Sequence, residues 1–135
     1  MNRTLTILTI DDDSNMRYLT SRTLKTHISD YDLVIHEADN GALGLHHLTT
    51  SSSLPDLILL DINMPVMDGL AFLREYENVS LSSNPSPIFI LSSMVTYWKQ
   101  EPVMIPKFVK GLFEKPLNKG HISEIILYLI SEYSS

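Results

Sequence analysis

The stretch Leu57-Ile58-Leu59-Leu60-Asp61 decides the fold, because four aliphatic residues in a row are followed at once by an acid. A short continuous apolar run is typical of a strand that is buried on both faces of a parallel sheet. Residues 88–91 repeat the pattern and end at Ser92, and the β-branched and aliphatic residues 4–10 end at consecutive acids. The sequence therefore predicts three strands, each followed by a polar side chain.

Further strands and helices alternate along the rest of the chain. Parallel strands need crossover connections, so this alternation predicts an α/β fold with a parallel sheet and helices on both faces. The predicted strands are residues 4–10, 32–37, 57–60, 88–91 and 112–114, the last one entered through Gly111. The predicted helices are residues 14–27, a short helix after Asn40-Gly41, residues 68–78, the first part of 94–110, and a helix capped by Asn118.

Helix signals and breakers set the expected boundaries. Asp13 or Ser14 is expected to cap the first helix, and Pro102 and Pro106 limit the helix within 94–110 to a short piece before an irregular segment. The apolar faces are expected from helical spacing. They comprise Met16, Tyr18, Leu19 and Leu24 in the first helix, Ala42, Leu45 and Leu48 in the second, and Ile122, Ile125, Ile126, Leu129 and Ile130 in the last.

Length and composition fit one domain that can build a hydrophobic core. The chain has 135 residues, of which 44% are apolar and 19% are charged, a balance that excludes disorder driven by charge. Ten Lys and Arg against sixteen Asp and Glu give a net charge of −6, which argues against sequence-independent binding to nucleic acid or anionic membrane. We expect residues 1–135 to form a single domain without an effector domain.

Neither cysteine nor a membrane segment is evident in the sequence. The chain has no cysteine, so disulfides, thiolate metal ligands and thiol nucleophiles are excluded. Its apolar runs are far shorter than the ~18 residues of a transmembrane helix, and its first residues do not resemble a secretory signal. The expected location is the cytoplasm.

Chemically versatile side chains follow four of the five predicted strands. Asp11 and Asp12, Asp61, Ser92 and Lys115 stand at these positions, and the second strand alone lacks such a residue. In open parallel sheets the functional site lies beyond the carboxyl ends of the strands, where the strand order reverses. We therefore expect these side chains to converge, and the second strand to lie at the edge of the sheet.

The expected cluster favours a magnesium ion and phosphoryl chemistry. Two carboxylates about 4 Å apart repel one another by ~1 kcal/mol in water and by ~4 kcal/mol at an effective dielectric constant of 20. Mg²⁺ is suited to neutralise them, because it prefers oxygen ligands and is usually held by one or two carboxylates. Lys115 adds a fixed positive charge, and Ser92 can donate a hydrogen bond to a phosphoryl oxygen. A carboxylate that attacks phosphorus in this setting becomes an acyl phosphate.

Simpler interpretations of the same residues remain open at this point. Residues 11–13 could be an acidic cluster at a helix N-terminus, where carboxylates suit the helix dipole. Ser93 could replace Ser92 as the relevant hydroxyl, and Lys115 could pair only with Glu114 at the surface. The five histidines, at positions 27, 36, 46, 47 and 121, are scattered without metal-ligand spacing, and we interpret them as surface or partly buried residues.

Four segments together resemble the response regulator receiver domain of two-component signalling. The resemblance covers essentially the whole chain, and its most specific part is the string that begins at Asp61 and ends at Gly69. The segments are Ile10-Asp11-Asp12-Asp13-Ser14, Leu60-Asp61-Ile62-Asn63-Met64-Pro65-Val66-Met67-Asp68-Gly69, Leu91-Ser92-Ser93 and Glu114-Lys115-Pro116. The resemblance implies a CheY-like, flavodoxin-like fold with a five-stranded parallel sheet in the order 2-1-3-4-5.

The resemblance also implies a role for each site residue. Asp61 is the expected phosphoacceptor. Mg²⁺ is the expected cofactor, bound directly by Asp12, Asp61 and the backbone carbonyl of Asn63, and by Asp11 through water. Ser92 and Lys115 are expected to bind the phosphoryl group, Ser92 as the switch hydroxyl. The bond between Lys115 and Pro116 is a candidate for a cis peptide.

Two positions depart from the family pattern. The residue three before the lysine is often aromatic in this family, but here it is Leu112, with Phe113 one place later. Aromatic switching is therefore not expected at Leu112. Pro102 and Pro106 are expected to reshape the segment after the fourth strand, where Tyr97 and Trp98 are candidates for the output surface. Asn63 and Met94, which flank the site, are expected to tune the lifetime of the phosphorylated form.

The predicted function is that of a receiver that catalyses its own phosphorylation and dephosphorylation rather than that of an enzyme acting on other molecules. Its expected partners are a histidine kinase or phosphotransfer protein and a downstream protein effector, with no nucleic acid and no membrane. One alternative is an unphosphorylated pseudo-receiver that acts only as a protein-binding module. An aspartyl-phosphate hydrolase is a weaker alternative, because such enzymes place a second acid two residues after the nucleophile and this chain has Asn63 there.

Overall fold

Five strands and four helices make up the part of the chain that the computed structural model describes, residues 3–62, 68–79, 85–93 and 106–133. They are β1 (Arg3–Ile10), α1 (Ser14–His27), β2 (Tyr31–Ala38), α2 (Gly41–Thr50), β3 (Leu57–Asp61), α3 (Gly69–Val79), β4 (Ile88–Ser92), β5 (Val109–Glu114) and α5 (Lys119–Tyr133). Within these ranges, every helix falls short of the length and hydropathy that crossing a bilayer requires. The short helix predicted after Met94 lies outside the described residues.

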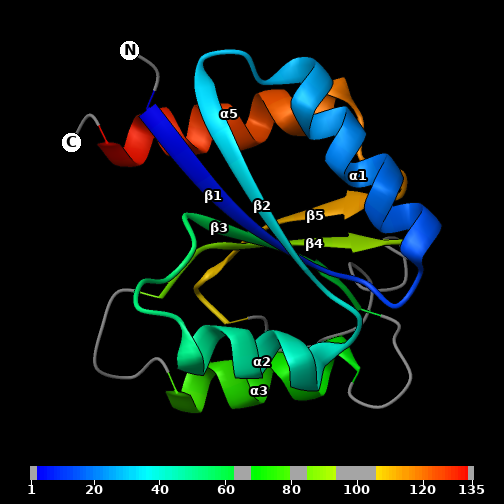
Figure 1. Cartoon of the computed structure of the whole chain (residues 1–135), viewed down its shortest axis with the longest axis vertical. Coiled ribbons are helices and arrows are strands. Elements are labelled where there is room, and N and C mark those ends of the chain that lie inside the picture. The colour runs from blue at the N-terminus through cyan, green and yellow to red at the C-terminus, as the bar shows by residue number, and fades with distance from the viewer. Residues whose placement is uncertain (1–2, 63–67, 80–84, 94–105, 134–135) are drawn as a thin grey trace.

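The strands form one parallel sheet in the order β2-β1-β3-β4-β5, which confirms the predicted fold and places β2 at an edge (Figure 1). Ile7 of β1 lies opposite Leu57 of β3, and Ile58 of β3 lies opposite Ile88 of β4. Because all strands run in one direction, their carboxyl ends meet at the same edge of the sheet. The residues at the ends of β1, β3, β4 and β5, or directly after them, are thereby brought together.

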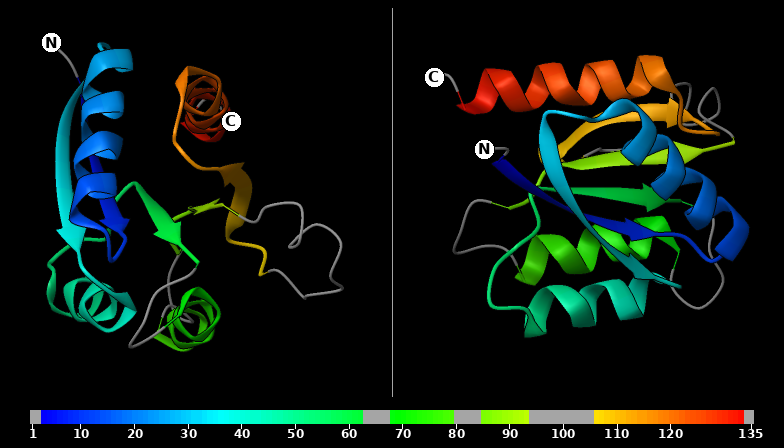
Figure 2. Two further views of the ribbon diagram at one scale, coloured as in Figure 1. Left: turned by 90° about the vertical axis from the view of Figure 1, so that its right-hand side faces the viewer. Right: turned by 45° about the horizontal axis from the view of Figure 1, so that its top comes forward.

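Helices cover both faces of the sheet, with α1 and α5 on one side and α2 and α3 on the other (Figure 2). The buried strand β3 supplies both cores by alternation. Ile58 and Leu60 join the cluster that includes Phe72 of α3, whereas Leu57 and Leu59 join the cluster that includes Ile125 of α5. This burial on both faces explains why the four residues of β3 before Asp61 are all apolar.

The helices begin at the predicted caps. The side chain of Asp13 accepts hydrogen bonds from the backbone N–H groups of Asn15 and Met16, so Asp13, rather than Ser14, caps α1. Asn118 Oδ1 accepts from the backbone N–H of His121 at 3.0 Å and caps α5 in the same way. These caps satisfy backbone N–H groups in the first turns of α1 and α5, which have no partner within the helix.

Some residues that the helical spacing placed in the core are exposed instead. Tyr18 and Leu19 of α1 are 62% and 48% exposed, Ile130 of α5 is 52% exposed, and Ala42 of α2 is also exposed. The reason is that each helix touches the sheet along a narrow stripe. In α1 that stripe consists of Thr20 and Leu24, so its apolar neighbours on the helix face solvent.

Strand β5 begins three residues earlier than predicted, at Val109, so residues 109–110 are not part of an irregular segment. Gly111 lies inside the strand rather than before it, opposite Phe89. A Cβ atom at Gly111 would approach Cδ1 of Phe89 to 2.9 Å, so the glycine makes room for the ring. The half-exposed start of β5 lacks the continuous apolar run that revealed β3 and β4.

Gly69 begins α3 where this helix comes close to the end of β3. Its backbone N–H donates to the carbonyl of Ile62 at 2.9 Å, and a Cβ atom there would lie 2.6 Å from Cα of Ile62. No side chain fits into that space. The first turn of α3 is completed by Asp68, whose carboxylate accepts from the N–H of Ala71.

Candidate functional site

Three carboxylates gather at the carboxyl ends of β1 and β3, as the sequence predicted. Asp11 and Asp12 follow β1, Asp61 ends β3, and one carboxylate oxygen of each lies within 4.8 Å of the others. In the described part of the chain, no other group of three or more His, Cys, Asp or Glu residues has ligand atoms so close together. Asp11 and Asp61 are each only 5% exposed, whereas Asp12 faces solvent.

Lys115 reaches this cluster from the end of β5. Its Nζ lies 3.1 Å from Oδ2 of Asp11 and 3.1 Å from Oδ1 of Asp61. The interpretation of Lys115 as a partner only of Glu114 is therefore wrong. Burial of the ammonium acts to lower the pKa of Lys115, but the neighbouring carboxylates of Asp61 and Asp11 outweigh it and raise the pKa above its usual value. Lys115 consequently holds a fixed positive charge between two buried acids.

The three consecutive acids after β1 have different tasks. Oδ1 of Asp11 accepts from the backbone N–H of Asp13 at 2.9 Å, while its Oδ2 faces Lys115, so both oxygens are held. Asp13 caps α1, whereas Asp12 joins Asp11 and Asp61 in the cluster. The interpretation of residues 11–13 as a helix N-terminal cluster thus holds for Asp13 and is wrong for the other two.

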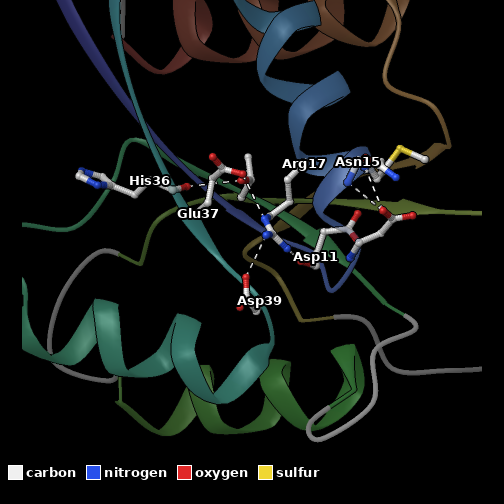
Figure 3. A network of polar contacts seen from close by, with 9 residues as sticks. Asp11, Asn15, Arg17, His36, Glu37 and Asp39 are labelled. Atoms are coloured by element: carbon white, nitrogen blue, oxygen red, sulfur yellow. Dashed lines mark hydrogen bonds and ion pairs between the residues drawn. The ribbon is translucent and has the colours of Figure 1, made fainter.

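Arg17 is a residue that the sequence analysis missed. It lies one turn into α1, and its guanidinium donates to the backbone carbonyl of Asp11 at 2.6 Å (Figure 3). The same group donates to Glu37 at 3.1 Å and pairs with Asp39 at 3.0 Å, both at the end of β2. Arg17 therefore ties the loop that carries Asp11 and Asp12 to the neighbouring strand. No local sequence pattern connects Arg17 to these partners, so the sequence held no signal for its role.

The ends of β4 and β5 complete the edge of the site. Ser92 is the last residue of β4 and is 1% exposed, whereas Ser93 is exposed. The backbone carbonyl of Ser92 accepts from the backbone N–H of Lys115 at 3.0 Å, which joins the two strand ends. The peptide bond between Lys115 and Pro116 is cis. Of the two candidate hydroxyls, that of Ser92 lies on the buried edge of the sheet.

The charge balance of the cluster favours a bound cation. Three carboxylates and one ammonium leave two negative charges in a partly buried pocket. Carboxylate oxygens are the ligands that Mg²⁺ prefers. Because Asp12 is exposed, water and an anionic group can reach the pocket from solvent on its side. Asn63, Met94, Tyr97 and Trp98, which the sequence analysis also considered, lie outside the described residues.

A comparison with known families matches residues 7–127 to the response regulator receiver domain. The chain belongs to the response regulator receiver family. The matched region contains all the residues of the cluster, namely Asp11, Asp12, Asp61 and Lys115.

Curated relatives of this receiver domain are longer proteins. It is 37% identical over 90 residues to the sensor histidine kinase CheAY of Helicobacter pylori, covering 67% of this chain and 11% of that protein. It is 30% identical over 108 residues to a protein-glutamate methylesterase/protein-glutamine glutaminase of Rhodopseudomonas palustris, covering 80% of this chain and 27% of that protein. The chain thus spans between about a tenth and a quarter of the length of these relatives.

Solved structures of response regulators share the receiver fold. A two-component response regulator from Cytophaga hutchinsonii superposes with a TM-score of 0.78 at 21% identity, covering 96% of this chain and 99% of that one. A second from Legionella pneumophila gives 0.73 at 27% identity, with 95% and 99% covered. A response regulator protein from Thermotoga maritima, solved in complex with Mg²⁺ and BeF, gives 0.72 at 25% identity, with 93% and 99% covered.

The receiver differs from the family pattern on β5, and the structure shows what each residue contacts. Leu112 is half-buried and packs against the core on the α2 and α3 side. Phe113 faces the opposite core, where its ring stacks on Phe89 at 5.5 Å and on His121 at 4.4 Å. Phe113 therefore cannot serve as an aromatic residue on the face of Leu112, because consecutive strand residues point to opposite faces.

Proposed function

We propose that this receiver domain accepts a phosphoryl group on Asp61 in the presence of Mg²⁺ and signals through a change in its conformation. One observation carries the proposal: the carboxylates of Asp11, Asp12 and Asp61 converge within 4.8 Å beside the ammonium of Lys115. A pseudo-receiver that only binds proteins has no need for this costly concentration of charge. The same pocket suits both a divalent cation and a phosphoryl group.

The proposed metal ligands are the carboxylates of Asp12 and Asp61, with Asp11 acting through water and the backbone carbonyl of Asn63 completing the set. Asp12 is exposed and Asp61 is buried, so an ion held between them would still reach solvent on one side. Mg²⁺ retains several water ligands in such sites. When bound, the ion supplies positive charge that offsets the oxygens of the transferring phosphoryl group.

The chemistry assigned to the chain is nucleophilic attack by Asp61. One carboxylate oxygen of Asp61 forms a bond to phosphorus while the bond from phosphorus to the donor breaks. For a phosphohistidine donor, the leaving imidazole nitrogen keeps the electron pair and takes a proton from water. The product is an acyl phosphate, and water later attacks its phosphorus to release phosphate and restore Asp61.

Lys115 and Ser92 are the proposed partners of the phosphoryl oxygens. The Lys115 ammonium already lies 3.1 Å from Oδ1 of Asp61, so it is placed to donate hydrogen bonds to the oxygens of a phosphoryl group on that carboxylate. The Ser92 hydroxyl is proposed to move toward the phosphoryl group. A backbone hydrogen bond from Lys115 to Ser92 joins the ends of β4 and β5, so we propose that such a movement changes the balance between two conformations of these strand ends.

The proposed partners are proteins. A histidine kinase or a phosphotransfer protein would supply the phosphoryl group, and a downstream protein would read the changed surface. The relatives include a sensor histidine kinase and a protein-glutamate methylesterase, which supports a role in two-component signalling for this chain. Mg²⁺ dependence and cytoplasmic location are part of the same proposal.

The proposal is tested by incubating the protein with acetyl phosphate and Mg²⁺ and measuring its intact mass. We expect one added phosphoryl group, and we expect none when EDTA removes the metal. Asp61→Asn should abolish the addition. Asp13→Asn is the matched control, because Asn caps helices as well as Asp does and Asp13 lies outside the cluster.

The binding-only alternative makes the opposite prediction. In that case the wild-type protein would remain unmodified at every concentration of acetyl phosphate, although it would still fold. If a folded Asp61→Asn variant still gains a phosphoryl group, the acceptor is another residue. Far-UV circular dichroism of each variant separates loss of the site from loss of the fold.

A further inference from the structure

Two histidines from different elements meet ring to ring outside the acidic pocket. The ring centroids of His36 on β2 and His47 on α2 lie 4.7 Å apart, with an angle of 42° between the ring planes. Both are surface or half-buried residues, as predicted, but their position next to each other was not predicted. Figure 3 shows the side chain of His36 pointing away from the Arg17 network, consistent with the alternation along β2 that sends Glu37 toward Arg17.

The spacing of these rings fits two ligands of one metal ion. Metal–nitrogen bonds of about 2.0–2.1 Å place the centroids of two imidazoles on one ion roughly 4.5–5.5 Å apart. The observed separation of 4.7 Å falls in that range. His36 is exposed and His47 is half-buried, so an ion can reach the pair from solvent.

Imidazole nitrogens and carboxylate oxygens suit different metal ions. A neutral imidazole offers a nitrogen lone pair, which Zn²⁺, Cu²⁺ and Ni²⁺ accept readily and Mg²⁺ does not. The chemistry of the pair is therefore distinct from that of the oxygen cluster at Asp61.

We propose that His36 and His47 form a two-histidine site for a divalent transition-metal ion such as Zn²⁺, with water completing the coordination. A bound ion would link the edge strand β2 to α2. His46 is adjacent to His47 on the same helix, and adjacent helical residues do not share a face, so His46 lies outside the proposed ligand pair.

The test is a titration with Zn²⁺ followed through the ring signals of the histidines by NMR. Excess Mg²⁺ is present throughout, so that Zn²⁺ does not report on the acidic pocket. We expect one equivalent of Zn²⁺ to shift the signals of His36 and His47 together. His36→Gln and His47→Gln should each weaken the binding at least about tenfold, whereas His46→Gln should leave it unchanged.

Thermal unfolding gives a second measurement that does not depend on phosphorylation. Zn²⁺ should raise the melting temperature of the wild type and of His46→Gln, but not that of His36→Gln or His47→Gln. The proposal is overturned if Zn²⁺ binds equally well to all four proteins, if it shifts only amides near Asp11 and Asp61, or if 0.1 mM Zn²⁺, roughly the affinity limit of a weak two-ligand site, produces no change.

Discussion

Lys115 lies between two buried carboxylates, and that position determines what its removal does. In Lys115→Ala we expect phosphorylation by acetyl phosphate to slow by about a hundredfold, because a preorganised positive charge at the phosphoryl oxygens is lost. Mg²⁺ should bind at least as tightly as before, since a competing cation is gone. Rates from intact mass and an isothermal titration with Mg²⁺ measure both effects.

The matched control for this lysine is Lys119→Ala, which removes an exposed lysine from the start of α5. It should leave the rate and the Mg²⁺ affinity unchanged. A Lys115→Ala protein that no longer folds, even with Mg²⁺ present, would show that the lysine is mainly a structural partner of Asp11 and Asp61. Unchanged phosphorylation in a folded variant would remove it from the site.

Arg17 offers a second test at the residue scale. Arg17→Ala should lower the free energy of unfolding by about 1–2 kcal/mol, chiefly through the lost hydrogen bond to the carbonyl of Asp11, because exposed ion pairs contribute little. It should also weaken Mg²⁺ binding, since the loop that carries Asp12 loses its anchor. Urea unfolding and Mg²⁺ titration provide the measurements.

Arg22→Ala is the control for Arg17, because Arg22 is an exposed arginine on the same helix. If both arginine variants have equal stability and equal Mg²⁺ affinity, the anchoring role of Arg17 is contradicted. Sequence analysis identified the acids and Lys115 because each follows a strand directly. It missed Arg17 because its three partners come from the loop after β1 and from the end of β2, which no local pattern connects.

At the scale of one element, the start of α5 should make stability depend on pH. Nδ1 of His121 accepts from the backbone N–H of Asn118 at 3.2 Å, while Oδ1 of Asn118 accepts from the N–H of His121. Burial lowers the pKa of His121, although the charges of Glu124 and Glu114 partly oppose this. A histidine whose pKa is lower in the folded state stabilises the fold above its unfolded pKa of about 6.5. This contribution is lost as the pH falls below that value.

We predict that the free energy of unfolding falls less between pH 7.5 and pH 5.5 in His121→Gln than in the wild type. Glutamine keeps an acceptor for the N–H of Asn118 but does not titrate. Urea unfolding at the two pH values measures the difference. His47, whose pKa is also lowered, contributes equally in both proteins. Equal pH dependence of the two proteins would contradict the assignment.

The elements themselves were predicted to different degrees, for a physical reason. The central strands β3 and β4 are buried on both faces, so four consecutive apolar residues carry the signal of burial in each. Strand β5 is half-exposed and was predicted three residues too short. The predicted apolar faces of the helices included too many residues. Spacing shows which side of a helix is apolar but not how narrow its contact with the sheet is, and Tyr18 and Leu19 were therefore predicted to be buried although they are exposed.

At the scale of the whole molecule, mutual repulsion among the carboxylates of Asp11, Asp12 and Asp61 lowers the stability of the metal-free fold, and a bound cation should reduce that repulsion. Asp12→Asn should raise the free energy of unfolding without metal by about 2 kcal/mol, because two repulsive pairs, with Asp11 and Asp61, are removed and each costs ~1 kcal/mol in water. The same change should weaken Mg²⁺ binding and reduce the stabilisation that Mg²⁺ gives to the wild type. Chemical unfolding at several Mg²⁺ concentrations measures both effects.

Asp13→Asn again serves as the control, because it changes the same net charge one residue away while the cap is kept. Equal metal-free stabilisation in both variants would mean that overall charge, rather than the pocket, is responsible. The fold and the members of the pocket could be predicted, because strand ends in a parallel sheet share one edge. The pairing of His36 with His47 could not, because it depends on how α2 is placed across β2.

The central claim is that Asp61 carries the phosphoryl group, and the most direct measurement is to locate the modified residue. After reaction with acetyl phosphate and Mg²⁺, borohydride reduces an aspartyl phosphate to homoserine, which tandem mass spectrometry places in the sequence. We predict homoserine at position 61 and at no other aspartate, in a reaction that EDTA prevents. Homoserine at position 11, 12 or 68, or its absence from a folded protein that binds Mg²⁺, would contradict the claim.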